Sequence, residues 1–218
     1  MKQGSTELVF ILDRSGSMAG LEKDTIGGFN SMLERQKAEK GTCRITTVLF
    51  DHHEEILHDR IDIQAVRKMT SKEYQVGGST ALLDAVGRTI RKIGLVQKNS
   101  DPAYRAEKVL FVIITDGEEN ASREYTRTKV RQMIHHQQEK YRWEFIFLGA
   151  NIDAADAAEH LGIRRDRAQN YHADKEGIDL NFTVMSEAVS KFRQTAEVPD
   201  DWNADIERDY RARGGEQP

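Results

Sequence analysis

The chain has almost no cysteine, since Cys43 is the only one among its 218 residues. An intrachain disulfide is therefore excluded. A predicted strand that starts by Leu8 leaves no room for a secretory signal peptide ahead of it. We therefore expect a reducing, cytoplasmic setting, in which thiols stay free.

Long apolar runs and a strong excess of one charge are missing as well. No apolar run reaches the length of a membrane-spanning helix. The net charge is −4 and the pI is about 6.0, so the basic surface typical of nucleic-acid-binding proteins is not indicated. We therefore expect neither a membrane nor a nucleic acid as partner. Apolar residues make up 38% and charged residues 31%, which is typical of a globular domain.

Apolar strand patterns alternate along the chain with amphipathic helix patterns. Strands are predicted at 8–12, 45–50, 55–61, 109–114, 143–149 and 169–172, and helices at 21–40, 63–69, 82–93, 125–139, 154–161 and 178–192. The strand at 55–61 is densely charged, which suits an antiparallel strand at a sheet edge. The order predicts a doubly wound, Rossmann-like α/β fold, with a mostly parallel six-stranded sheet and helices on both faces.

The composition changes near the end of the chain. Residues 1–193 carry the alternating pattern and form one predicted domain. Residues 194–218 are highly charged, with few apolar side chains. Such a segment buries little apolar surface, so we expect a flexible charged tail.

A chemically distinctive motif follows the first strand. Five apolar residues, Leu8 to Leu12, lead directly into Asp13-Arg14-Ser15-Gly16-Ser17. In open α/β sheets, ligands bind just beyond the carboxyl ends of the strands. A carboxylate and two hydroxyls at this place suit a hard cation such as Mg²⁺, Mn²⁺ or Ca²⁺.

Two further segments repeat this design. The apolar strand 109–114 leads into Thr115-Asp116-Gly117, and Thr80 lies in a loop behind the pair Gly77-Gly78. Neither glycine-rich nucleotide-binding motif is present, so a nucleotide site is not indicated. The glycines instead free the backbone, which lets Thr80 approach another group closely.

Together, Asp13-x-Ser15-x-Ser17, Thr80 and Asp116 resemble the metal-ion-dependent adhesion site of von Willebrand factor A (vWA) domains. The similarity covers residues 5–193 and is greatest to stand-alone bacterial or phage members. It implies that the serine and threonine hydroxyls bind Mg²⁺ (or Mn²⁺ or Ca²⁺) directly, with one or both aspartates acting through water. It also implies that an Asp or Glu of a partner protein fills an open coordination position. By analogy with similar bacterial proteins, the chain would serve as an assembly or stress-response adaptor, with an AAA+ ATPase system as a candidate partner.

The main alternative is a metal-dependent phosphohydrolase that uses the same strand-end site. Such an enzyme needs a second acid two residues after its nucleophilic Asp, where this chain has Ser15. A serine hydrolase would need a G-x-S-x-G frame, which is also missing. A purely structural polar cluster is a third interpretation. We favour a binding protein without enzymatic activity.

Three further pairs of residues have more ordinary interpretations. His52 and His53 are candidate metal ligands, but no third imidazole or thiolate stands at a ligand spacing, which favours a solvated turn. His135 and His136 would point about 100° apart on a helix and cannot chelate one ion together. The acidic pair 118–119 is expected to cap the next helix.

Overall fold

The computed structural model describes residues 4–215, which form an α/β fold. The strands are β1 (Thr6–Asp13), β2 (Cys43–Phe50), β3 (Glu54–Asp62), β4 (Lys108–Thr115), β5 (Glu144–Gly149) and β6 (Ala168–Asn170). The helices are α1 (Glu22–Ala38), α2 (Leu82–Asn99), α3 (Arg127–Tyr141), α4 (Ala154–Leu161), α5 (Lys175–Thr195) and α6 (Ala204–Ala212). Short 3₁₀ helices lie at η1 (Gly16–Met18), η2 (Ile63–Ala65), η3 (Pro102–Tyr104) and η4 (Arg165–Arg167). None of the helices within residues 4–215 has the length and apolar character needed to cross a membrane.

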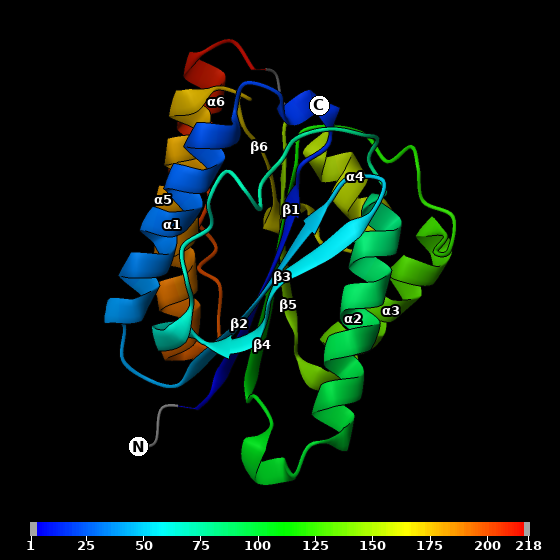
Figure 1. The fold of residues 1–218 in the computed structure, drawn as a ribbon, viewed down its shortest axis with the longest axis vertical. Helices are drawn as coiled ribbons and strands as arrows, with labels where there is room; N and C mark the ends of the chain where they lie inside the picture. The colour runs from blue at the N-terminus through cyan, green and yellow to red at the C-terminus, as the bar shows by residue number, and fades with distance from the viewer. Residues whose placement is uncertain (1–3, 216–218) are drawn as a thin grey trace.

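The six strands form one sheet in the order β3-β2-β1-β4-β5-β6. Only β3 runs antiparallel, and it lies at the edge as predicted. Helices α1 and α5 cover one face of the sheet, and α2 and α3 lie on the other (Figure 1). The predicted doubly wound architecture is therefore confirmed.

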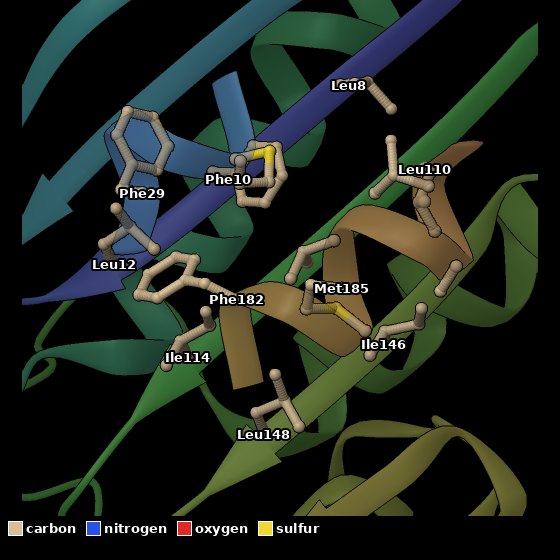
Figure 2. Close-up of a cluster of buried hydrophobic side chains, with 14 of the residues drawn as sticks. Leu8, Phe10, Leu12, Phe29, Leu110, Ile114, Ile146, Leu148, Phe182 and Met185 are labelled. Carbon is tan, nitrogen blue, oxygen red and sulfur yellow. The ribbon is translucent and has the colours of Figure 1, made fainter. Parts of the chain in front are cut away.

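The central strands alternate their side chains between the two faces. Leu8, Phe10 and Leu12 of β1 point into the cluster beneath α1 and α5, which Figure 2 shows with Phe29 and Phe182. The intervening residues of β1 point into the second cluster, on the side of α2 and α3. Because both faces are buried, β1 and β4 carry continuous apolar runs in their middle rather than alternating with polar residues.

Helix α1 packs on α5 through a close approach at Gly28. A Cβ at Gly28 would overlap the Phe182 ring of α5, whereas a Cβ at Gly27 would meet nothing within 4 Å. A glycine in a helix allows such a close approach of its neighbour. The close contact at Gly28 is with another helix.

The helix predicted at 63–69 is wrong apart from its first turn. Only η2 is helical, and the chain then runs extended to Met69. The side chain of Asn30 explains the difference. Its Nδ2 donates to Met69 O at 2.8 Å, and its Oδ1 accepts from Met69 N at 2.9 Å. These bonds replace the backbone partners that a helix would supply.

The prediction of a flexible tail from residue 194 is wrong for the described part of that segment. Helix α5 continues to Thr195, and α6 follows. Val198, Trp202 and Ile206 are all buried, and Trp202 Nε1 donates to Asp166 O at 2.9 Å. The segment has few apolar residues, but these three join the core cluster beneath α1 and α5, and of the three only Ile206 lies on α6. Residues 216–218 lie outside the described part.

The sheet reverses its winding beside β1. The chain passes from β1 to β2 on one side, and β4 pairs with β1 on the other. The carboxyl ends of β1 and β4 therefore meet at a topological switch point, where α/β proteins bind their ligands. The loop with η1 follows β1 at this edge.

Candidate metal centre

Asp13, the last residue of β1, organises the first loop of the site. Its Oδ1 accepts a hydrogen bond from Ser15 N at 2.7 Å, and its Oδ2 accepts one from the Thr115 hydroxyl at 2.5 Å. Asp13 is 2% exposed. Both carboxylate oxygens are thus used to hold neighbouring segments. Such a residue orients a site rather than offering a free oxygen to a ligand.

Ser15, Ser17 and Asp116 are brought together although 99 residues separate Ser17 from Asp116. The hydroxyls of Ser15 and Ser17 lie 3.0 Å apart, and the Ser17 hydroxyl donates to Asp116 Oδ1. The other oxygen, Asp116 Oδ2, is buried without a hydrogen-bond partner among the described residues. One carboxylate oxygen therefore remains free beside the hydroxyls.

Thr80 approaches the same place from the loop before α2. A Cβ placed on Gly117 would lie 3.4 Å from Ser17 Oγ and 3.7 Å from Thr80 Oγ1, so the two hydroxyls lie on either side of this glycine. Asn120 fixes the loop, because its Oδ1 accepts from Thr80 N at 2.9 Å and its backbone N donates to Thr80 O at 3.0 Å. All five predicted residues thus gather at one edge of the sheet.

Arg14 and Tyr74 hold the first loop in place. The Arg14 side chain donates to Asp51 Oδ2 at 3.1 Å and to Glu55 Oε2 at 2.7 Å. The buried Tyr74 hydroxyl donates to the Asp13 carbonyl. Gly16 N also donates to Gly78 O at 3.0 Å, which joins this loop to the segment that bears Thr80.

The site concentrates negative charge in a buried place. Burial raises the pKa of Asp116 from 3.8 to about 6, the Ser17 hydrogen bond opposes that rise, and the nearby Asp13 carboxylate adds to it. Burial also raises the pKa of Asp13, against hydrogen bonds from Ser15 and Thr115. Within residues 4–215, no cationic side chain forms an ion pair with either carboxylate. The site is therefore electrostatically suited to a cation.

Two hollows flank the site and offer room for a ligand larger than an ion. One, of about 870 Å³, is lined by His52, Ser79 and Arg123 among others. The other, of about 310 Å³, lies between Gly117 and α4 and includes the exposed Glu118.

Glu119 caps a different helix from the one predicted. Its carboxylate accepts from Leu83 N at 2.9 Å, at the start of α2, and from Ala121 N and Ser122 N at 3.0 and 2.7 Å. It therefore caps α2 rather than the following α3, and it holds the loop after β4 against the loop before α2. Among residues 4–215, Glu118 makes no hydrogen bond that would cap a helix.

The motif analysis missed three residues that shape the site. Thr115 was predictable, since it directly precedes Asp116 at the end of a strand. Asn120 bonds to Thr80, 40 residues away in sequence, and Tyr74 bonds to Asp13, 61 residues away. No local sequence pattern predicts such distant contacts.

No protein-family profile matches the chain, and no curated protein matches it. Solved structures do. A D319A mutant of the PilB minor pilin from Streptococcus sanguinis shares 11% identity at a TM-score of 0.58, covering 90% of this chain and 64% of that one. The ArnB paralog VWA2 from Sulfolobus acidocaldarius shares 18% identity at a TM-score of 0.54, covering 85% and 45%. A von Willebrand factor type A structure from Catenulispora acidiphila shares 14% identity at a TM-score of 0.56, covering 86% and 43%.

This chain thus spans about two fifths to two thirds of the length of these structures. At such identities the likeness concerns the fold alone. Since two of these structures are named as vWA proteins, residues 4–215 adopt a vWA-like α/β fold.

Proposed function

We propose that this protein is a metal-dependent protein-binding module. Asp13, Ser15, Ser17, Thr80 and Asp116 would hold Mg²⁺, with Mn²⁺ or Ca²⁺ as substitutes, and form a complete metal-ion-dependent adhesion site. The observation that carries this proposal is the buried Asp116 Oδ2, which has no hydrogen-bond partner among the described residues. A buried carboxylate oxygen without a partner is costly, and a bound cation would offset that cost.

The donor set fits a hard cation. It offers three hydroxyls and two carboxylates, all oxygen, and no sulfur or imidazole. Asp13 would fix the loop, since both of its oxygens already hold Ser15 N and Thr115. The hydroxyls are uncharged, so they would leave most of the ion's charge unneutralised. When bound, the ion supplies an open coordination position that suits a carboxylate.

The partner would therefore present an Asp or Glu side chain at its surface. The hollows on either side of the site would take up the neighbouring residues of that partner. An assembly or stress-response role in a bacterial cytoplasm, beside an AAA+ ATPase system, is part of the proposal by analogy. Cys43 suits a reducing compartment, because burial raises the pKa of its thiol to about 12 and keeps it unreactive.

The geometry favours binding over hydrolysis. A phosphohydrolase of the aspartyl-phosphate type needs a carboxylate oxygen free to attack, but both oxygens of Asp13 accept hydrogen bonds. Asp116 Oδ1 likewise accepts from Ser17. We expect the purified protein to turn over neither phosphoesters nor peptides. Metal-dependent turnover that disappears in Asp13→Ala would instead support the enzyme.

Calorimetric titration with Mg²⁺ tests the proposal. The wild type should bind one ion, and Asp13→Ala should abolish binding. Glu118→Ala is the matched control, because it removes a negative charge from the same rim without touching the donor set. Equal binding by wild type and Asp13→Ala would refute the site. A pull-down from the native host in Mg²⁺, compared with one in EDTA, then tests for metal-dependent capture of a partner.

A further inference from the structure

We propose a second cation site at the turn after β2, formed by Asp51, His52 and His53, that takes a transition metal of the Zn²⁺ class. It is separate from the hard-ion centre and does not depend on the function proposed for that centre. The turn was expected to be merely solvated, because no third imidazole or thiolate stands nearby in sequence. The structure supplies a carboxylate as the third ligand instead.

The three side chains converge on one point. One possible ligand atom from each residue lies within 4.8 Å of the other two. The Nδ1 atoms of His52 and His53 lie 3.2 and 3.9 Å from Asp51 Oδ1, and the two ring centroids are 4.1 Å apart. Zinc bonds of about 2.0 to 2.2 Å in a tetrahedron place neighbouring ligand atoms about 3.3 to 3.6 Å apart. The observed spacings need only small side-chain rotations to match this geometry.

The carboxylate is held in position before any ion arrives. Asp51 is 9% exposed, and its Oδ2 accepts from Arg14 Nε at 3.1 Å. Its Oδ1 accepts from His53 N at 2.7 Å and lies 3.2 Å from His52 Nδ1. Asp51 N donates to His53 O at 2.9 Å, and Asp51 O accepts from Ala81 N at 2.8 Å. Such support from surrounding groups is typical of metal ligands.

The histidines are open to an incoming ion. The side chains of His52 and His53 are 51% and 75% exposed. Both line the hollow of about 870 Å³, so water can complete the coordination. Glu54 lines the same hollow, and its buried Oε2 has no hydrogen-bond partner among the described residues. Arg88 Nη1 lies 3.5 Å from Glu54 Oε1, so the charge of Glu54 is already paired and Glu54 is not counted among the ligands.

The chemistry of this cluster differs from that of the neighbouring centre. Imidazole nitrogen suits zinc, copper and nickel, whereas an all-oxygen set suits magnesium and calcium. The two sites would therefore select different ions, although both lie at the carboxyl edge of the sheet. His52 also lies against Gly78, where a Cβ would overlap the ring. Because Gly78 O accepts from Gly16 N, an ion here would stiffen the segment between the two sites.

Titration with Zn²⁺ at pH 7.5, in excess Mg²⁺ to occupy the hard-ion centre, tests the proposal. The wild type should bind one Zn²⁺, and the double variant His52→Ala/His53→Ala should bind it at least tenfold more weakly. The matched control is His135→Ala/His136→Ala, which removes the chain's other adjacent pair of exposed histidines from α3. This control should bind as the wild type does.

Three results would overturn the site. Binding that survives His52→Ala/His53→Ala would place the ion elsewhere, and an equal loss in the control pair would show unspecific imidazole binding. Wild-type affinity in Asp51→Asn would remove the carboxylate from the ligand set. Circular dichroism shows whether each variant folds, and the exposed histidine pairs should be replaceable without loss of the fold. The Mg²⁺ titration of Asp13→Ala tests the hard-ion centre separately, so either proposal can be refuted without the other.

Discussion

Asp116→Asn should stabilise the metal-free protein while destroying its response to Mg²⁺. The substitution keeps the shape of the side chain, and its Oδ1 can still accept the hydrogen bond from Ser17. It removes a buried charge that no cationic side chain among residues 4–215 compensates. A residue that serves binding is expected to lower the stability of the ligand-free protein in this way.

The magnitude follows from the perturbed pKa. Burial, with the nearby Asp13 carboxylate, raises the pKa of Asp116 from 3.8 to about 6. A shift of this size corresponds to at most about 3 kcal/mol at neutral pH, since one unit is worth about 1.4 kcal/mol. Solvent at the rim screens part of this energy, so we expect Asp116→Asn to gain about 1 to 2 kcal/mol.

Because the pKa of Asp116 is raised in the folded chain, the gain in stability of Asp116→Asn should appear only in a defined pH range. Well below pH 3.8 the carboxyl is protonated in both the folded and the unfolded chain, and the charge of Asp116 then makes no difference between the two proteins. As the pH rises, the unfolded chain ionises first. The stability of the wild type therefore falls relative to Asp116→Asn until the pH exceeds about 6.

Urea unfolding at several pH values, with and without Mg²⁺, measures both effects. Mg²⁺ at 100 times its Kd should stabilise the wild type by about 2.7 kcal/mol and leave the variant unchanged. Glu118→Gln serves as the control, because it neutralises an exposed carboxylate two residues away. If Asp116→Asn follows the wild type at every pH, burial of that charge is not costly. If the variant keeps the Mg²⁺ response, Asp116 does not help to hold the ion.

Three further predictions concern buried positions outside the candidate site. Gly28→Ala should lower the free energy of unfolding by about 1 to 3 kcal/mol through overlap with Phe182. Gly27→Ala, with open space around it, should raise that free energy by about 1 kcal/mol, as measured by urea unfolding. Equal changes in the two variants would refute the close approach at Gly28. Trp202→Ala should cost about 3 kcal/mol and expose residues 196–215 to trypsin, and a wild-type segment that is trimmed just as fast would show that it does not dock. Burial lowers the pKa of His58, so the folded protein should lose stability as the pH falls through 6.5, where the unfolded chain takes up the proton first. The urea midpoint of His58→Gln should therefore fall less between pH 7 and 5 than that of the wild type. Parallel pH profiles of the two proteins would exclude His58 as the cause of the loss.

The architecture was predictable because its signals are local. Strands β1 and β4 are buried on both faces and carry uninterrupted apolar runs, Leu8–Leu12 and Val109–Ile114, which set them apart from the helices. The charged residues of β3 marked the sheet edge in the same direct way. The positions of Asp13 and Asp116 followed, since each is tied to the end of an apolar strand.

The errors arose where distant side chains decide the structure. The segment before Met69 is extended because Asn30, on another element, supplies its hydrogen bonds. The segment after α5 looked flexible because composition averages conceal a spacing of four between Val198, Trp202 and Ile206.

At the proposed metal centre, the residues present do not agree with what strand preference, apolar pattern and packing favour. Elsewhere in the sheet, strand preference, apolar pattern and packing agree, as a folding sequence requires. At the ends of β1 and β4, two buried carboxylates lie near each other without a cationic side chain from the described residues, and one of their oxygens has no partner. Folding alone does not favour this arrangement, because burying a neutral residue at either position would cost less free energy. Its presence at the switch point therefore points to a ligand. The surfaces that would select the proposed partner come from several loops of the rim, which no single motif encodes.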